Sequence, residues 1–149
     1  MYYNYYVIVI YTSPGCASCR KVRKFLKDNG HEFIDKNIFT TLLNEKEIKY
    51  LLSRTENGSD DLISRRSKII QNNNIDIDSM STSELINFIK NNPSVLRRPI
   101  IIDVNNFQVG YDEEEIEIFN KVKELAKCDK SCSHYETCGK LRREFEWKY

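Results

Sequence analysis

The amino-acid sequence predicts an α/β fold in which a βαβ unit precedes a ββα unit and a helical insertion separates the two. The first observation is an apolar run at residues 5–11, followed by a Pro-Gly turn and a basic segment. The second is the helical spacing of apolar residues in 44–54 and 82–90. The third is an apolar run at 100–103 that begins directly after Pro99, and proline is tolerated at the start of a strand.

The first half of the chain has the pattern of two strands joined by a helix. The helix is expected over residues 17–29, and Gly30 follows it as the residue that most readily closes a helix C-terminus. Residues 31–37 then predict a second strand. A helical crossover usually joins parallel neighbours, so we expect the two strands side by side and parallel.

The middle of the chain, residues 42–95, is expected to be a helical insertion. An Asn-Gly pair is a strong turn signal, and a threonine hydroxyl can cap the first N–H groups of a helix. The expected pieces are a helix over 44–54, a turn at 55–58, short helical segments over 60–73, and a helix over 82–90 capped by Thr82.

The last part of the predicted domain is a hairpin followed by a helix. A strand over 97–103 leads through an asparagine turn to a short strand at 107–109. A helix is expected over 112–127, with acids in its first turn and lysines in its last. This order of elements is that of a thioredoxin-like fold, in which we expect a cis peptide bond before Pro99, placed against the cysteine pair.

Cys16 and Cys19 stand at the expected N-terminus of the first helix, where a thiol becomes most reactive. Unpaired backbone N–H groups and the helix dipole favour the thiolate there. Basic residues in the next two turns should act in the same direction: Arg20, Lys21, Arg23 and Lys24. The spacing allows the sulfur atoms to bridge, so Cys19 can resolve an oxidised Cys16. Half of a zinc site has the same spacing but needs a second pair, so we interpret the pair as a thiol–disulfide switch.

Composition indicates a soluble globular chain in a reducing compartment. Hydrophobic residues make up 40% and charged residues 30% of the 149, and no apolar run approaches the roughly 18 residues of a membrane span. The N-terminal segment lacks the features of a secretion signal. We therefore expect a cytoplasmic protein whose five cysteines serve redox or metal chemistry rather than a structural disulfide framework. A net charge of +1 argues against non-specific DNA binding.

Six short segments between residues 7 and 127 carry a specific combination of motifs. They are YTSPGCASCR from Tyr11, NIF from Asn37, RTENG from Arg54, SRRSK from Ser64, LRRPIIID from Leu96 and QVGY from Gln108. In order and spacing these segments resemble the Spx/MgsR group of the arsenate-reductase-like (ArsC) family. The resemblance implies a cytoplasmic transcriptional regulator that binds the C-terminal domain of the RNA polymerase α subunit and is controlled by a CxxC dithiol–disulfide switch.

The resemblance also implies roles for individual residues. Cys16 and Cys19 match the redox pair, and Arg98 matches the arginine that lies beside the pair and senses its state. A guanidinium there would stabilise a thiolate or bind an anion. Gly58 matches the glycine at the contact with the α subunit, where the lack of a side chain permits close backbone approach.

Partners follow from the same resemblance. Arg66 and Lys68 match basic positions of the insertion, which are surface charge or contacts within a polymerase–promoter complex. We expect promoter DNA to be engaged only through that complex. No cofactor and no membrane are expected, and the protein alone should be a monomer.

A glutaredoxin-coupled arsenate reductase is the main alternative, since such enzymes share the fold, the first cysteine and an Arg-Pro segment. Their motif has serine where this chain has Cys19, and they carry a further arginine in a Gly-Arg-Pro segment. Here Gly110 is followed instead by tyrosine and three acids, Asp112, Glu113 and Glu114, whose charge would repel an oxyanion. A general thiol oxidoreductase is a third hypothesis, which leaves the helical insertion without a role. We therefore expect a regulator and not an enzyme.

A cysteine-rich extension over residues 128–149 follows the predicted domain of residues 1–127 and lies outside the resemblance. It carries three cysteines and a histidine in one short segment: Cys128, Cys132, His134 and Cys138. Such ligands suit zinc, but their spacing differs from that of the usual zinc-binding pairs. A plain extension with free thiols, a zinc site and an additional redox pair remain as alternatives, and we expect the plain extension.

Full-length protein is accordingly expected to contain no stoichiometric zinc, and so is a chain ending at Lys127. Elemental mass spectrometry of both after dialysis measures the metal content. About one zinc per full-length chain, absent from the shortened chain, would contradict this expectation and indicate coordination by the extension.

Overall fold

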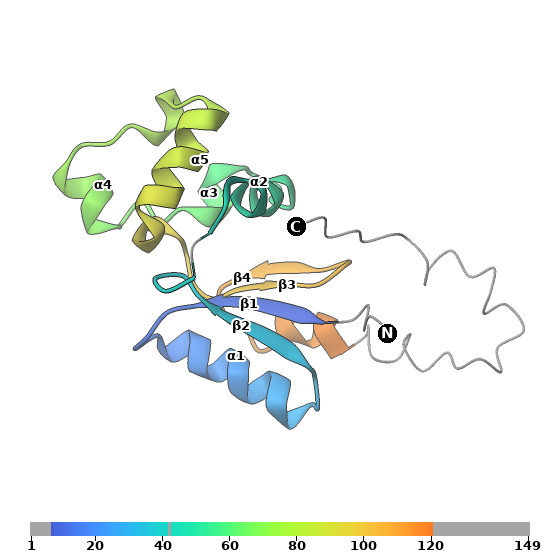
Figure 1. The fold of residues 1–149 in the computed structure, drawn as a ribbon. Coiled ribbons are helices and arrows are strands. Elements are labelled where there is room, and N and C mark those ends of the chain that lie inside the picture. Colours follow the sequence, from blue (N-terminus) through green and yellow to red (C-terminus); the bar gives the residue numbers. More distant parts are fainter. Residues whose placement is uncertain (1–6, 42, 121–149) are drawn as a thin grey trace, which may run out of the picture.

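The computed structural model describes residues 7–41 and 43–120, and its elements follow the order βαβ, helical insertion and ββ hairpin (Figure 1). The strands are β1 (Ile8–Thr12), β2 (Phe33–Asn37), β3 (Ile100–Ile102) and β4 (Phe107–Val109). The α-helices are α1 (Ala17–Asp28), α2 (Glu45–Ser53), α3 (Ser59–Leu62), α4 (Lys68–Asn72) and α5 (Thr82–Asn91). Short 3₁₀ helices are η1 (Ile77–Ser79), η2 (Pro93–Val95) and η3 (Glu115–Glu117). Among the described residues, no helix is long and apolar enough to span a membrane.

The sheet has the strand order β2-β1-β3-β4, which places the first strand of the chain in its interior. β1 pairs in parallel with β2, as predicted, and antiparallel with β3. Tyr11 lies opposite Ile100 in the antiparallel register, so the end of β1 and the beginning of β3 are neighbours. The peptide bond between Arg98 and Pro99 is cis, as predicted.

Alternating side chains along β1 and β3 divide the core into two layers. Ile10 and Ile101 face α1 and pack with Leu26. Tyr11 and Ile100 face the helices of the insertion on the other side of the sheet. All five side chains are at most 1% exposed. Because both faces of these strands are covered, their sequences are continuous apolar runs rather than alternating ones.

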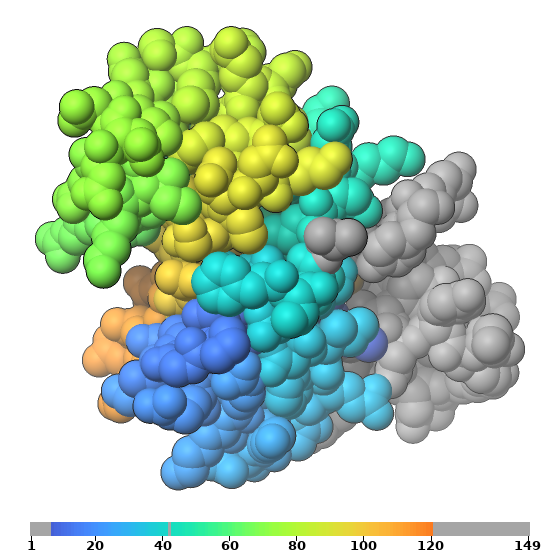
Figure 2. All heavy atoms as spheres, turned by 60° about the vertical axis from the view of Figure 1, so that its left-hand side comes forward, coloured from blue at the N-terminus to red at the C-terminus, as the bar shows by residue number. Residues whose placement is uncertain are grey.

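A buried carboxylate fastens the insertion to the sheet. Glu47 of α2 is 8% exposed, and its Oε1 accepts hydrogen bonds from the Tyr11 hydroxyl of β1 and the Lys36 ammonium of β2, both at 2.6 Å. The Asn44 side chain caps α2 by accepting from the Glu47 N–H at 2.8 Å. The first turn of α2 is therefore held in place over β1 and β2. In the space-filling view the insertion forms the upper part of the molecule and α1 the lower part (Figure 2).

The residue that caps α5 is Ser81 and not Thr82 as predicted. The Ser81 hydroxyl accepts a hydrogen bond from the Glu84 N–H at 3.3 Å, and the Glu84 carboxylate accepts from the Ser81 N–H at 2.7 Å. The second bond holds the pKa of the Glu84 carboxyl below its usual value. Such a reciprocal pair needs an acid three residues after the cap, and Glu84 stands at that distance from Ser81.

The final helix starts later than the predicted Asp112. The Asp112 carboxylate accepts hydrogen bonds from the N–H groups of Glu115 and Glu114, at 3.0 and 2.8 Å, which lowers the pKa of that carboxyl. η3 follows, and α-helical residues begin at 118. Asp112 therefore precedes the helix as a capping residue. Residues 121–127 of the predicted helix lie outside the described residues.

Replacing Glu47 with leucine is expected to lower the free energy of unfolding by about 3 kcal/mol, because the Lys36 ammonium loses a buried counter-charge. Urea denaturation followed by circular dichroism measures the change. Lys24→Ala is the matched control, since it breaks a pair with Asp28 whose side chains are 81% and 64% exposed. That loss should stay within about 0.5 kcal/mol. Equal losses in the two variants would refute the role given to Glu47.

Candidate functional site

The loop between β1 and α1 places Cys16 at the start of the helix. Ser13 is buried, and Gly15 has a φ of +74°, a left-handed conformation that turns the chain into α1. Cys16 is the N-cap of α1, and its Sγ accepts a hydrogen bond from the Cys19 N–H at 3.1 Å. This donor and the positive end of the helix dipole both favour a negative charge on the Cys16 sulfur.

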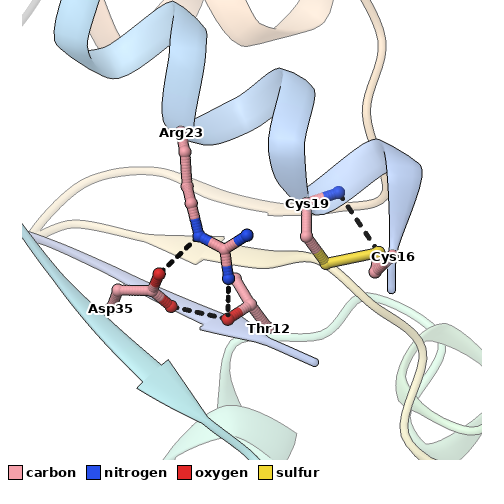
Figure 3. The surroundings of a disulfide bond; sticks show 5 residues. All are labelled: Thr12, Cys16, Cys19, Arg23 and Asp35. Carbon is pink, nitrogen blue, oxygen red and sulfur yellow. Dashed lines mark hydrogen bonds and ion pairs between the residues drawn. A yellow bond between two sulfur atoms is a disulfide. The ribbon is translucent and has the colours of Figure 1, made fainter. Parts of the chain in front are cut away.

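Cys16 and Cys19 are joined by a disulfide bond, with their Cα atoms 5.2 Å apart (Figure 3). Cys19 is fully buried, whereas Cys16 is partly exposed. A reagent in solution therefore meets Cys16 first, and Cys19 lies behind it. These exposures fit the predicted division into an attacking and a resolving cysteine, which remains a prediction.

One turn after Cys19, Arg23 ties α1 to both strands beneath it (Figure 3). Its Nε donates to the Asp35 carboxylate of β2 at 2.5 Å, and its Nη2 donates to the Thr12 hydroxyl of β1 at 2.8 Å. The Thr12 hydroxyl in turn donates to Asp35. Arg23 is among the cations expected to favour a thiolate, but the Asp35 carboxylate offsets its charge. Asp35 and Thr12 were not predicted as part of the site, because the three side chains come from three elements.

Cys16 lies at the wall of a cavity of about 570 Å³. The register of β1 and β3 brings the loop before α1 next to the segment before β3, and the end of β4 and one insertion residue complete the wall. The lining residues are Ser13, Pro14, Gly15, Cys16, Ser64, Leu96, Arg97, Arg98, Val109 and Gly110. Two are basic and none is acidic, so the cavity favours an anion.

The two arginines of the cavity make different contacts. Arg97 serves the insertion: its N–H donates to the Leu62 carbonyl at 2.7 Å and its Nε to the Ile63 carbonyl at 3.2 Å. Arg98 has no hydrogen bond or ion pair with any described residue, and its guanidinium carbon lies 5.6 Å from the centre of the Phe39 ring. Arg98 therefore provides a cation without a counter-charge in the wall that also contains Cys16. Phe39 was not predicted as a site residue from the sequence. The NIF motif that contains it was the one signal that could have indicated it.

The acids that follow Gly110 do not line this cavity. Asp112, Glu113 and Glu114 are exposed, and none of them belongs to its wall. Asp112 is directed at backbone N–H groups of its own segment. The sequence predicted that these acids would repel an oxyanion. Because none of them lines the cavity, they are not placed to repel an oxyanion from its wall. The departures from the arsenate-reductase motifs that remain are Cys19 and the missing arginine after Gly110.

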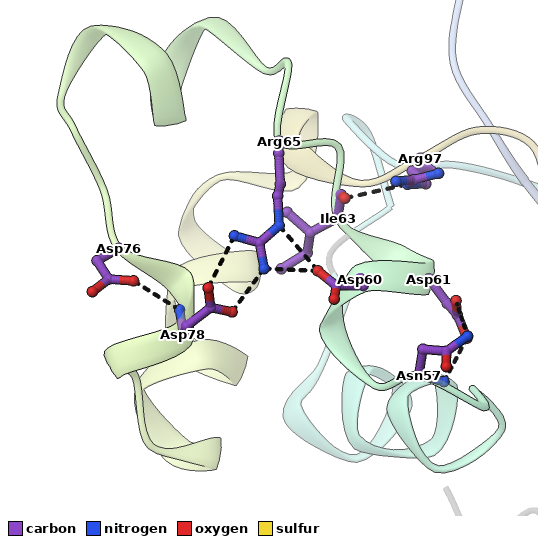
Figure 4. Close-up of polar contacts among 8 residues, drawn as sticks. All are labelled: Asn57, Asp60, Asp61, Ile63, Arg65, Asp76, Asp78 and Arg97. Atoms are coloured by element: carbon purple, nitrogen blue, oxygen red, sulfur yellow. Dashed lines mark hydrogen bonds and ion pairs between the residues drawn. The ribbon is translucent and has the colours of Figure 1, made fainter.

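Gly58 lies outside the cavity lining, in an exposed turn between α2 and α3. Its φ is +65°, and a Cβ built there would meet no atom within 4 Å, so the turn requires glycine for its conformation and not for space inside the molecule. The Asp61 carboxylate accepts from the N–H group of Asn57 at 2.8 Å (Figure 4) and from that of Glu56 at 3.0 Å. These bonds lower the pKa of that carboxyl. The turn thus presents a braced backbone without a side chain at its tip.

Arg65 forms two ion pairs on the exposed surface of the insertion. Its Nη2 lies 2.7 Å from an oxygen of Asp60 and 2.7 Å from an oxygen of Asp78 (Figure 4). Its hydrogen bonds to Asp78 and Asp60 raise the pKa of the guanidinium. Arg66 and Lys68, by contrast, are exposed and form no ion pair within the described part of the chain. The two predicted basic positions are therefore available to a partner.

The candidate ligands of the extension lie outside the described residues: Cys128, Cys132, His134 and Cys138. Across the residues that the structure does describe, no three His, Cys, Asp or Glu side chains gather as a metal site.

Comparison with known proteins establishes the family. A family model, described as the ArsC family, matches residues 11–119. The chain is 50% identical over 113 residues to the global transcriptional regulator Spx of Streptococcus pneumoniae (strain ATCC BAA-255 / R6), which covers 76% of this chain and 85% of that protein. It is 46% identical over 113 residues to Spx of Bacillus subtilis (strain 168), covering 76% and 86%. The chain belongs to the ArsC family, and the resemblance to the Spx group is confirmed.

A solved structure shares the fold at lower identity. The arsenate reductase from Vibrio cholerae matches with a TM-score of 0.64 at 19% identity, over 80% of this chain and 99% of that one. At this identity the likeness establishes the fold alone. The thioredoxin-like architecture with a helical insertion, predicted from the sequence, is confirmed.

In a Cys19→Ser variant, the pKa of Cys16 is expected to lie below the ~8.5 of a free cysteine, because the helix N-terminus stabilises its thiolate. The pH dependence of iodoacetamide alkylation, followed by mass spectrometry of the peptide carrying Cys16, measures it. In the matched Cys16→Ser variant, the buried Cys19 should react at least about tenfold more slowly. A Cys16 pKa at or above ~8.5, or equal rates, would contradict an activated Cys16.

Proposed function

We propose that this protein is a redox-controlled transcriptional regulator that acts by binding the C-terminal domain of the RNA polymerase α subunit. The observation that carries the proposal is the disulfide between Cys16 and Cys19 in the wall of a basic cavity. It occurs in a chain that is 50% identical over 113 residues to a regulator named Spx. The name of that relative supports a role in transcription, and the disulfide supports control by thiol chemistry.

The switch is a two-electron change at one bond. On reduction by a dithiol, the Cys16–Cys19 bond breaks, Cys16 leaves as a thiolate and Cys19 takes up one proton. The dithiol closes to a disulfide and releases two protons. On oxidation by a peroxide, the Cys16 thiolate attacks oxygen to give a sulfenic acid and hydroxide. The Cys19 thiol then displaces the sulfenic oxygen, which leaves as water when the disulfide closes.

A short chain of contacts connects the cavity with the turn at Gly58. Arg98 lines the cavity and is adjacent to Arg97, whose N–H donates to the carbonyl of Leu62, the last residue of α3. α3 begins directly after Gly58. Ile63 and Leu96 form a further bridge between the same two segments. A displacement of the segment before β3 would therefore be passed to α3, which supports coupling between the disulfide and a partner bound at Gly58.

The turn at Gly58 suits a close backbone contact with a partner. Its tip is exposed, carries no side chain and is braced by Asp61. A partner surface can approach such a backbone more closely than one covered by a β-carbon. Because the turn is already ordered, binding there need not supply the free energy to order it.

Promoter DNA is expected to be contacted only within the polymerase complex. Arg66 and Lys68 offer two exposed cations on the insertion, but the net charge of the chain is only +1. Phosphate contacts by so few cations give weak, salt-sensitive binding. Tethering to the polymerase would raise the effective concentration of these side chains at the DNA.

Arsenate reduction is the second candidate, and the basic cavity beside Cys16 favours it. Arg97 and Arg98 could hold an oxyanion near the sulfur of Cys16. Two departures disfavour it: a buried Cys19 closes a disulfide with Cys16, and the segment after Gly110 has no arginine. The regulator hypothesis also gives the exposed turn of the insertion a role that a reductase does not.

Gly58→Arg is expected to abolish binding to the purified α C-terminal domain, since a long cation would stand where the partner approaches the backbone. Gly58→Ala is the matched control: at a φ of +65° both variants carry the same backbone strain, about 1–3 kcal/mol, but only arginine extends from the turn. Calorimetric titration in reducing and in oxidising buffer should show no binding by the arginine variant. The alanine variant should lose less than about tenfold in affinity.

Equal binding by Gly58→Arg and the unmodified protein would refute the proposed contact surface. Efficient arsenate turnover by the unmodified protein with glutaredoxin and a thiol reductant would favour the enzyme instead. Circular dichroism of both glycine variants checks that the fold is intact, and thiol trapping checks that the Cys16–Cys19 disulfide still forms.

A further inference from the structure

We propose that Phe39 is a positioning residue of the redox switch: its ring holds the Arg98 side chain while the Cys16–Cys19 disulfide is closed, and thereby stabilises the oxidised form. This inference rests on the proposed redox function and adds one residue to the same site.

The contact between Arg98 and Phe39 is the first observation. The guanidinium carbon lies 5.6 Å from the ring centre, within the range in which a cation is attracted by the face of an aromatic ring. Arg98 also lines the cavity whose wall contains Cys16. Within the described residues, Arg98 forms no hydrogen bond or ion pair, so the ring is the group that fixes it in the disulfide form.

Exposure of Phe39 is the second observation. The residue is 49% exposed, so burial of its own apolar surface explains only part of its presence at this position. The Arg98 guanidinium lies over the face of this exposed ring, where the ring can attract a cation. A contact with Arg98 therefore gives this exposed aromatic a role.

The backbone at Phe39 is fixed to the strand that carries the cysteine loop. The Phe39 N–H donates to the Asn37 side-chain oxygen at 2.9 Å, and the N–H of the buried Ile38 donates to the Thr12 carbonyl at 2.9 Å. Thr12 is the last residue of β1, directly before the loop to Cys16. Phe39 is thus held relative to the disulfide by a short, hydrogen-bonded connection.

The two redox forms differ in what they offer the Arg98 guanidinium. A closed disulfide carries no charge and attracts the guanidinium only weakly, so the Phe39 ring is a better partner for Arg98 than the disulfide is. Reduction breaks the S–S bond, takes two electrons from a dithiol, places one proton on Cys19 and leaves Cys16 as a thiolate. A charge-assisted contact with that thiolate is stronger than a half-exposed contact with a ring. Arg98 should then leave Phe39, so the ring contributes to the oxidised form alone and shifts the equilibrium towards the disulfide.

Phe39→Leu tests this directly, because leucine keeps an apolar side chain but removes the aromatic face. The dithiol–disulfide equilibrium is expected to move about threefold towards the dithiol, which is about 14 mV less negative in midpoint potential at 29.6 mV per tenfold. Full-length protein is equilibrated in mixtures of oxidised and reduced dithiothreitol, and the Cys16–Cys19 peptide is quantified by thiol trapping and mass spectrometry. Phe39→Tyr, which keeps the ring, should retain the original potential.

Two controls separate this role from a general effect on the fold. Ile34→Ala alters another apolar residue with 49% exposure on β2 and should leave the potential unchanged. In an Arg98→Gln background, Phe39→Leu should have no further effect, because the cation that the ring holds is gone. Circular dichroism confirms that each variant is folded.

Three results would overturn the inference: an unchanged potential in Phe39→Leu, a shift towards the disulfide, or an equal shift in Ile34→Ala. A shift towards the disulfide would mean that the ring holds Arg98 for the thiolate instead. If the unmodified pair did not titrate at all, the proposed redox function would fail together with the inference. If it titrated normally and only Phe39→Leu were without effect, the inference alone would fail.

Discussion

The antiparallel pairing of β1 with β3 is the constraint on which the site depends. Tyr11 lies opposite Ile100, so the strand that ends before Cys16 runs beside the strand that begins after Arg98. A slip of β1 by one residue would turn the Tyr11 hydroxyl away from the buried Glu47 carboxylate that it bonds. This contact therefore helps to fix the register that sets the distance between the cysteine loop and the arginines.

Two neighbouring arginines contact different parts of the molecule, although both line the cavity. Arg97 donates to the carbonyl of Ile63 in the insertion, and Arg98 lies against the ring of Phe39 after β2. The doublet thus joins the sheet domain to the insertion within one short stretch of backbone.

Local signals account for what could be predicted from the sequence. The apolar runs of β1 and β3, the Cys16–Cys19 pair and the helices of the insertion all show in short windows, and the structure has them close to the expected bounds. Errors arose where two local signals competed, as when Ser81 and Thr82 were both suitable caps. The contacts of Arg23 with Asp35 and of Arg98 with Phe39 join segments distant in sequence. A single sequence without homologues carries no signal for such pairs.

The polar contacts beneath the disulfide restrict which part of the site could change conformation on reduction. Arg23 holds α1 to β1 and β2 through Thr12 and Asp35, and none of these bonds includes a sulfur atom. Opening the disulfide therefore removes a covalent restraint from the first turn of α1 without loosening the helix from the sheet. A change of conformation at Cys16 would then fall on the cavity side, where Arg97 also contacts the insertion. The Arg23 contacts hold the sheet side of the site in place, and the cavity side is where a change on reduction would occur.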